Sequence, residues 1–222
     1  MKIAAVYTST TPELIEMVNQ QLNAQFKDDS VTIVSYQDPS ILQEARDNGG
    51  VTPGCARRLL NLYEQAVKDG ANILFNICSS VGDVAKLAKP LYEMTGVKFV
   101  RIDEDMAMEA VRKGNRIGVV ATLRTTLEPT KRLIQDCAKV LGKEVVLVDA
   151  LADGAFGLNQ EDFKQMLIDT CSKVKDQVDI FLFAQGSMAY AEEAVSRAVG
   201  MPVLSSIRFG TAAVRKAADS MK

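Results

Sequence analysis

Two stretches of the chain share one pattern: Ile73–Ala85, with the sequence ILFNICSSVGDVA, and Ile180–Ala194, with the sequence IFLFAQGSMAYAEEA. In each, a short apolar run stops abruptly at small polar residues, and a helical pattern follows. An apolar run of this length beside a helix is typical of a buried strand in a parallel sheet. The first stretch carries Cys78 where the second carries Gln185. The pair therefore predicts a repeated strand–helix unit in which only one copy holds a nucleophile.

A second pair of segments repeats in the same order. KIAAVYTSTTPELIEMV resembles RIGVVATLRTTLEPTKRLI with Ile3 aligned to Ile117, an offset of 114 residues, and Cys78 aligns with Gln185 at an offset of 107. Two offsets so similar, from distant parts of the chain, indicate a duplicated unit of about four strands. We therefore expect an α/β fold made of two pseudo-symmetric parallel-sheet halves.

The expected strands alternate with amphipathic helical patterns, in which Pro12 and Pro129 fall in the first turns. The expected strands are Ile3–Tyr7, Val31–Tyr36, Ile73–Ile77, Lys98–Ile102, Arg116–Ala121, Glu144–Asp149, Ile180–Ala184 and Val203–Ser205. This alternation predicts two parallel sheets covered on both faces, one in residues 1–101 and one in 102–206. A C-terminal helix over 207–222 is expected to pack back on the first half.

Open parallel sheets bind ligands beyond the carboxyl ends of their strands. Two such halves facing each other would bring the polar residues after the first and third strand of each half around one cleft. These residues are Thr8–Thr10, Cys78–Ser80, Thr122–Thr125 and Gln185–Ser187. A cleft between the halves is therefore the expected active site.

The composition excludes several classes of function. The 222 residues are 47% hydrophobic, which is enough for real cores, and the net charge of −2 gives no electrostatic case for binding nucleic acid or an anionic membrane. The apolar run Ile3–Tyr7 near the start is too short for a signal peptide, and no other run approaches a membrane span. We expect a soluble, cytoplasmic protein.

The residues that are absent restrict the chemistry further. The chain has no histidine, which excludes Ser-His and Cys-His nucleophile pairs and any metal site that needs histidine. Acid–base chemistry then falls to carboxylates, Lys, Tyr or Cys. The four cysteines are scattered without a CxxC pair, so in a reducing cytoplasm we expect free thiols.

Cys78 is the first candidate for catalysis. It follows an expected strand and precedes a helix, where backbone amides and the positive end of the helix dipole favour a thiolate. The same amides, with the hydroxyls of Ser79 and Ser80, would hold a carboxylate or a developing enolate. The alternative is a small side chain that only packs at a strand end. We favour the functional interpretation because of the polar neighbours and the mirrored stretch at Gln185.

Cys55 is a possible second thiol. It lies in NGGVTPGCARRLL, a loop that enters a helix after the second strand, where Arg57 and Arg58 could also clamp a carboxylate. We favour the alternative, an ordinary helix start with a solvated basic pair. Cys137 and Cys171 lie in helical patterns and are expected to be core thiols.

The second half offers ligand-binding groups without a nucleophile. The amide of Gln185 can donate and accept hydrogen bonds to a ligand or can cap the next helix, and Gly186 permits close backbone approach. Arg124 could pair with a distal carboxylate or be an ordinary surface arginine. Hydroxyl donors to a ligand, each of which could instead be an N-cap, are Ser9, Thr10, Thr122, Thr125 and Ser187. No GxGxxG or P-loop pattern indicates a nucleotide site.

The sequence resembles the aspartate/glutamate racemase superfamily, which includes aspartate, glutamate and hydantoin racemases, maleate isomerases and arylmalonate decarboxylases. The resemblance covers nearly the whole chain. It is carried by ICSSVGD in place of the first cysteine motif, usually Cys-Asn-Thr, and by IGVVATLRTT in place of the Ala-Thr-x-x-Thr strand end. FLFAQGSM stands in place of the second cysteine motif, so Gln185 occupies the position of the second thiol.

The resemblance implies a mechanism without a cofactor or a metal. One thiolate removes the Cα proton of a small carboxylate or amino-acid substrate, and a second thiol on the opposite face returns one. Cys78 matches the first thiol, and Ser79 and Ser80 match its carboxylate-binding neighbours. The substrate loops after the first and fifth strands match Ser9 and Thr10, and Thr122 and Thr125. A homo-oligomer, such as a dimer, is implied by the same resemblance.

The missing second thiol leaves three hypotheses open. Our leading hypothesis is a racemase- or isomerase-like enzyme that acts at the carbon alpha to a carboxylate, with Cys78 as acid and base. Inversion would then need another proton donor, such as Cys55 or a water, or an intermediate that turns over within the site. The second is a single-thiol decarboxylase or lyase on a malonate-like acid, although the arylmalonate decarboxylases keep their cysteine in the other half. The third is a non-catalytic protein that binds small carboxylates.

Overall fold

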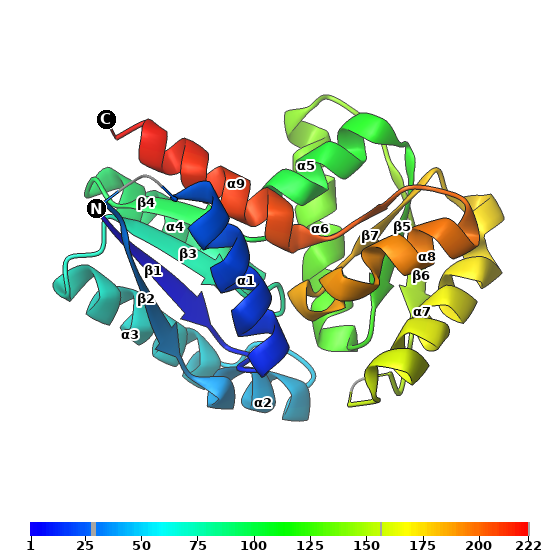
Figure 1. Ribbon diagram of the computed structural model, residues 1–222, viewed down its shortest axis with the longest axis horizontal. Coiled ribbons are helices and arrows are strands. Elements are labelled where there is room, and N and C mark those ends of the chain that lie inside the picture. The colour runs from blue at the N-terminus through cyan, green and yellow to red at the C-terminus, as the bar shows by residue number, and fades with distance from the viewer. Residues whose placement is uncertain (28–29, 156, 222) are drawn as a thin grey trace. The chain divides into compact units, whose positions relative to one another are not determined.

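The computed structural model describes residues 1–27, 30–155 and 157–221 (Figure 1). The chain forms two compact units, which we call unit 1 (Met1–Ile102 with Ile207–Lys222) and unit 2 (Asp103–Ser206). Each unit is a four-stranded parallel sheet flanked by helices. Within the described residues, no helix is both long and apolar enough to cross a membrane.

Unit 1 contains a sheet with the strand order β2-β1-β3-β4, in which all neighbours are parallel. Its elements are β1 (Lys2–Tyr7), α1 (Pro12–Gln25), β2 (Thr32–Gln37), α2 (Pro39–Asp47), α3 (Pro53–Lys68), β3 (Ile73–Ile77), α4 (Gly82–Met94), β4 (Lys98–Arg101) and α9 (Ser206–Asp219). Helices α3 and α4 cover one face of this sheet, and α1 and α9 cover the other (Figure 1). The central strand β3 is buried along its whole length, as its apolar sequence predicts.

Helix α9 is attached to unit 1 by close backbone packing. A Cβ atom on Gly210 would lie 2.8 Å from Cα of Ile102, so only glycine permits this approach of the helix to the end of β4. Further along α9, Arg215 donates to the carbonyl of Gln25 at 3.1 Å and lies 5.3 Å from the ring centroid of Phe26. The C-terminal helix therefore completes the sheet cover of the N-terminal unit.

Unit 2 repeats the topology of unit 1, with the strand order β6-β5-β7-β8. Its elements are α5 (Glu104–Lys113), β5 (Arg116–Ala121), α6 (Arg124–Val140), β6 (Val146–Leu151), α7 (Gln160–Val174), η1 (Lys175–Gln177), β7 (Ile180–Phe183), η2 (Gly186–Ala191), α8 (Glu192–Val199) and β8 (Val203–Leu204). The two units have the same strand order and the same parallel pairing. The α/β fold of two repeated parallel sheets that the sequence predicts is confirmed.

Several expected strands differ from the observed bounds by one residue, and two expectations differ by more. The strand expected over Glu144–Asp149 begins two residues later, because Val146 is the first residue opposite β5, and its N–H donates to the carbonyl of Asn115 at 2.7 Å. Pro129 is not in a first turn: α6 already begins at Arg124, so the proline lies inside the helix. Pro129 has no N–H to donate one turn back along α6, and the helix nevertheless continues to Val140.

Candidate functional site

The register of β1 and β3 brings two predicted segments together at one edge of the unit 1 sheet. Tyr7 and Ile77, the last residues of these strands, are paired in the parallel ladder. Thr8 and Cys78 are therefore neighbouring positions just beyond the strand ends. This is the edge at which open parallel sheets bind ligands.

Cys78 is the most accessible thiol of the chain. It is partly buried and packs against the unit 1 core, whereas Cys55, Cys137 and Cys171 are all buried. Burial raises the pKa of Cys171 to about 12, which holds that thiol in its neutral form at physiological pH. Chemistry that needs a thiol in contact with a ligand therefore falls to Cys78.

The Cys78 loop turns tightly into α4. The carbonyl of Ser79 accepts the N–H of Gly82 at 3.0 Å, and Ser79 and Ser80 are each only 5% exposed. The amide of Gly82 is thus used by the turn, which reduces the set of helix-start amides expected to face a ligand. The two serines follow the thiol directly in sequence and are buried in the turn.

Arg101 brings a positive charge to the start of α4. It is paired with Asn76 in the ladder of β3 and β4 and is 3% exposed. A Cβ atom on Gly82 would lie 2.5 Å from Nη2 of Arg101, so the guanidinium lies directly against the first turn of the helix. The guanidinium and the helix dipole both favour an anion at this end of α4.

Two buried hydroxyls mark the end of β1. Tyr7 and Thr8 are fully buried, and their Oη and Oγ1 atoms have no hydrogen-bond partner within the described residues. Burial raises the pKa of Tyr7 far above its usual range, so its phenol stays protonated. Unpaired buried hydroxyls are costly and are usually completed by a ligand or a water. Ser9 and Thr10 follow them and are partly buried.

Unit 2 shows the same pair of positions with different chemistry. Ala184 donates to Val120 at 2.9 Å, which places Thr122 and Gln185 side by side beyond the ends of β5 and β7. Oε1 of Gln185 accepts the backbone N–H of Thr122 at 2.7 Å, and Nε2 donates to Oγ1 of Thr122 at 2.7 Å. We call this pair the Thr122–Gln185 clamp. The glutamine side chain is thus held by the neighbouring strand end and does not cap η2.

The other predicted residues of unit 2 lie close to the clamp in sequence. Thr125 is the second residue of α6, and its Oγ1 has no hydrogen-bond partner among the described residues. Gly186 and Ser187 open η2 and are partly buried, whereas Arg124 is exposed at the start of α6. Of the five hydroxyl residues that could have been N-caps, none is at a cap position: the caps of α1, α6 and η2 are Thr11, Leu123 and Gln185.

Comparison with known proteins now assigns the family. The family model described as Asp/Glu/Hydantoin racemase matches residues 3–214. The chain belongs to this racemase family. No curated protein matches its sequence significantly. Family membership identifies the chain as an enzyme of the racemase/isomerase type.

Solved racemases share the fold at low sequence identity. Allantoin racemase from Klebsiella pneumoniae is 14% identical with a TM-score of 0.70, over 100% of this chain and 89% of its own. Glutamate racemase from Thermus thermophilus is 13% identical with a TM-score of 0.74, over 99% and 81%. Aspartate racemase from Picrophilus torridus is 14% identical with a TM-score of 0.66, over 99% and 95%. These values establish a common fold.

In this racemase-family chain, Cys55 is enclosed by unit 1. It is fully buried, its N–H donates to Oγ1 of Thr52 at 3.1 Å, and its Sγ donates to the carbonyl of Ile41 at 3.4 Å. Nearby, Arg58 is paired with Glu44 at 2.7 Å, and hydrogen bonds from Thr52 and Arg58 hold the pKa of that carboxyl below its usual range. Cys55 therefore lies in the first turn of α3 and packs, as the favoured alternative expects, whereas Arg58 is paired with Glu44 and is not simply solvated.

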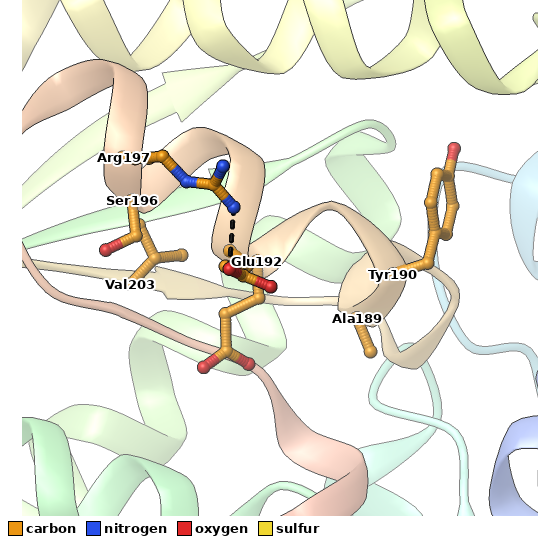
Figure 2. A pocket seen from close by; sticks show the side chains of 7 residues that line it. Ala189, Tyr190, Glu192, Ser196, Arg197 and Val203 are labelled. Carbon is orange, nitrogen blue, oxygen red and sulfur yellow. Dashed lines mark hydrogen bonds and ion pairs between the residues drawn. The ribbon is translucent and has the colours of Figure 1, made fainter.

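A hollow of about 540 Å³ lies within unit 2 on η2 and α8 (Figure 2). Its lining residues are Ala189, Tyr190, Glu192, Glu193, Ser196, Arg197 and Val203. Arg197 pairs with Glu193 at 2.6 Å, and Glu192 accepts a hydrogen bond from Ser205 (Figure 2 shows the first of these). Each charged group of the hollow thus already has a partner within unit 2, and none of the predicted site residues lines it. Within the described residues, no group of three or more His, Cys, Asp or Glu side chains could hold a metal ion.

Sequence reasoning did not single out Asn76 and Arg101. Asn76 is a fully buried carboxamide in the apolar strand ILFNI, and its Nδ2 donates to the carbonyl of Cys78 at 3.0 Å. A polar residue inside an otherwise apolar strand was a visible signal, because such a side chain must find buried partners. Arg101 gave no signal of this kind, since a basic residue at a strand end is common.

Proposed function

We propose that the chain is a cofactor-independent enzyme that acts at the carbon alpha to a carboxylate, with Cys78 as the thiol acid and base. The observation that carries this proposal is the placement of Cys78. It is the most accessible of the four cysteines. It lies beside Thr8, whose buried hydroxyl has no hydrogen-bond partner among the described residues, and next to the buried serines Ser79 and Ser80. A small carboxylate or amino acid is the substrate class that these groups fit.

The chemistry follows from the groups at this strand end. The Cys78 thiolate takes the proton from Cα, the C–H electron pair becomes the enolate, and the thiol is formed. Hydroxyls of Thr8, Ser79 and Ser80 donate to the substrate carboxylate, and the positive charge of Arg101 at the start of α4 favours the negative charge that develops. Return of a proton to Cα completes the exchange.

A second candidate reaction is favoured by the Thr122–Gln185 clamp. A glutamine cannot exchange a proton near neutral pH, and this one has both ends of its amide bonded to Thr122. Two-base inversion needs an acid on each face of the carbon. Decarboxylation of a malonate-like acid needs only one: the C–C bond breaks, CO₂ leaves, and the Cys78 thiol gives its proton to the enolate carbon.

Proton NMR in D₂O tests the proposal with a panel of amino acids, hydroxy acids and malonates. We expect loss of a substrate Cα–H signal, or release of CO₂, in the unsubstituted enzyme and its fall by at least about a hundredfold in Cys78→Ala. Cys137→Ala serves as the control, since it removes a buried thiol in α6 and should retain turnover.

Each result separates the hypotheses. Exchange with inversion assigns a racemase, and exchange without inversion, or loss of CO₂, assigns a one-sided thiol enzyme. Turnover that survives in Cys78→Ala contradicts the role of Cys78. If neither protein turns over any compound of the panel but both bind the same acid in a thermal-shift assay, the chain is a carboxylate-binding protein.

We further propose a cytoplasmic location. All four cysteines are free thiols in the structure, and the proposed chemistry needs Cys78 reduced. A reducing compartment maintains that state, whereas an oxidising one would convert an accessible thiol to a disulfide or a higher oxide.

We also propose that the enzyme forms a homodimer through α4. Three side chains on one stripe of this helix are strongly exposed: Leu87 at 78%, Leu91 at 59% and Met94 at 83%. Exposed Pro90 completes a contiguous apolar row. Apolar patches of this kind on one helix mark interaction sites more often than single exposed residues do.

The spacing and charge of the row favour a second copy of the chain as the partner. Positions 87, 90, 91 and 94 have the same spacing in both directions, so two copies of α4 crossing antiparallel about a two-fold axis would pack Leu87 on Met94 of the other copy. The same arrangement brings Lys86 of one copy near Glu93 of the other, which is the self-complementary pattern that a two-fold interface requires.

A further inference from the structure

We propose that Asn76 and Tyr63 are positioning residues that hold the Cys78 loop in its working conformation, an inference that rests on the proposed role of Cys78. Asn76 lies in the central strand β3, which is otherwise apolar, and is fully buried. Burying a carboxamide is unfavourable unless its donors and acceptors are matched. The two hydrogen bonds that the Asn76 side chain makes among the described residues therefore define what it does.

The partners fix the orientation of the Asn76 amide. Nδ2 donates to the carbonyl of Cys78 at 3.0 Å, and Oδ1 accepts from the hydroxyl of Tyr63 at 2.7 Å. A carbonyl oxygen can only accept, so the NH₂ group must face Cys78 and the oxygen must face Tyr63. The hydroxyl of Tyr63 is then the donor. The order from α3 to the loop is Tyr63, Asn76, Cys78, which we call the Tyr63–Asn76 relay.

Tyr63 gives the relay a rigid base. Its side chain is fully buried, with the ring edge-to-face against Phe99 at 5.1 Å between centroids and against Tyr92 at 5.9 Å. Edge-to-face contacts in a close-packed core restrict ring position. The hydroxyl therefore donates to Asn76 from a fixed place, and the position of the loop after β3 depends on the position of α3.

The relay sets the direction of one peptide group. The side chain of Asn76 holds the Cys78 carbonyl toward Asn76. Because the peptide between Cys78 and Ser79 is planar and trans, the N–H of Ser79 must point the opposite way. That orientation fixes the backbone on which the Cys78 thiol is mounted. It also leaves the Ser79 amide directed away from the relay, where it can serve a bound carboxylate or enolate.

The test measures the reactivity of the thiol without any substrate. Iodoacetamide is reacted with the native protein from pH 6 to pH 10, and the rate of modification of the Cys78 peptide is followed by mass spectrometry. The other three cysteines are at most 4% exposed, so the native protein reports on Cys78. Asn76→Ala removes the whole relay, and Tyr63→Phe removes one hydroxyl and leaves the ring. Tyr92→Phe is the matched control, since it removes a hydroxyl from the same aromatic cluster.

We expect the pH profile of Cys78 alkylation to shift in Asn76→Ala, with a rate at pH 8 that changes by about five- to tenfold, and to shift less in Tyr63→Phe. Tyr92→Phe should stay within about twofold of the unsubstituted protein. If Asn76→Ala does not fold, the comparison of the alkylation profiles of Tyr63→Phe and Tyr92→Phe decides whether the relay acts on Cys78. Unchanged profiles in both relay variants, or an equal shift in Tyr92→Phe, overturn the proposal.

A failure of the relay differs from a failure of the proposed function. Alkylation needs no turnover, so a shifted profile supports the relay even if Cys78→Ala shows that the thiol is not the acid and base. Where turnover is found, a positioning role predicts that Tyr63→Phe lowers kcat more than it raises KM, because the substrate carboxylate still meets Ser79 and Ser80. If the pH profile of Cys78 alkylation is unchanged in both relay variants while Cys78→Ala loses turnover, the relay is overturned and the proposed function stands.

Discussion

The four thiols of this racemase-family enzyme differ in chemistry because their surroundings differ. Cys78 is partly exposed at a strand end, whereas Cys171 is fully buried in the core of unit 2 among side chains such as Leu167 and Phe163. An apolar environment disfavours the thiolate, so desolvation raises the pKa of Cys171 to about 12. The sequence predicted this division, since Cys171 lies in a helical pattern and Cys78 follows a strand.

The shifted pKa of Cys171 makes stability depend on pH. Burial raises the pKa of this thiol from its ordinary value near 9 to about 12 in the folded protein, so folding favours its neutral form. Its contribution to stability is complete below pH 9 and is lost as the pH rises toward 12. We expect urea denaturation to show a smaller loss of unfolding free energy between pH 8 and pH 10.5 in Cys171→Ala than in the unsubstituted protein. Equal losses in the two proteins would show that Cys171 does not carry this dependence.

At the scale of the elements, the two strand-end pairs show how one fold supports different chemistry. In unit 1, Thr8 lies beside Cys78 with its hydroxyl unpaired among the described residues, and in unit 2 Thr122 lies beside Gln185 and is bonded to it twice. The offsets in sequence predicted that these positions are equivalent. They could not predict that the glutamine is held by Thr122, because that contact joins residues 63 positions apart.

The Thr122–Gln185 clamp joins the ends of β5 and β7, so it should contribute to stability. We expect Gln185→Leu to cost about 1–3 kcal/mol of unfolding free energy, because it leaves the Thr122 N–H without its partner. Thr122→Val should cost about 1 kcal/mol, and a double-mutant cycle measured by urea denaturation should give a coupling of about 1 kcal/mol between the two. Thr125→Val is the control, since its hydroxyl has no partner within the described residues. A coupling near zero would mean that the clamp adds nothing to stability.

The sequence predicted the elements better than the contacts between them. Apolar strands such as Ile73–Ile77 and Arg116–Ala121 were located with their observed bounds, because a buried parallel strand has a clear apolar pattern. The edge strand Val146–Leu151 was misplaced by two residues, because most of it is only partly buried and its start is set by pairing with β5. The Tyr63–Asn76 relay was missed because it depends on tertiary contact.

For the whole molecule, duplication explains why one unit can keep the thiol while the other keeps only the topology. Both units need the same buried strands and the same strand order to fold, so these features are shared. The residues beyond the strand ends are not required for the sheet, and they can diverge without loss of the fold. The exposed apolar row on α4 is likewise not needed to build the sheet, and we propose that it serves association between two copies.

The proposed homodimer gives a test at this scale. We expect Leu91→Glu to convert the dimer to a monomer in size-exclusion chromatography with light scattering, because it buries a charge beside the two-fold axis, against Pro90 of the other copy. Val140→Glu is the control, since Val140 is 77% exposed on α6 and lies outside the row. Charge reversal sharpens the test: Glu93→Lys should weaken the dimer by repelling Lys86 of the other copy, and Lys86→Glu in the same chain should restore it. A protein that is already monomeric, or a dimer that survives Leu91→Glu, contradicts this interface, because an antiparallel pair of α4 helices cannot form without contact at residue 91.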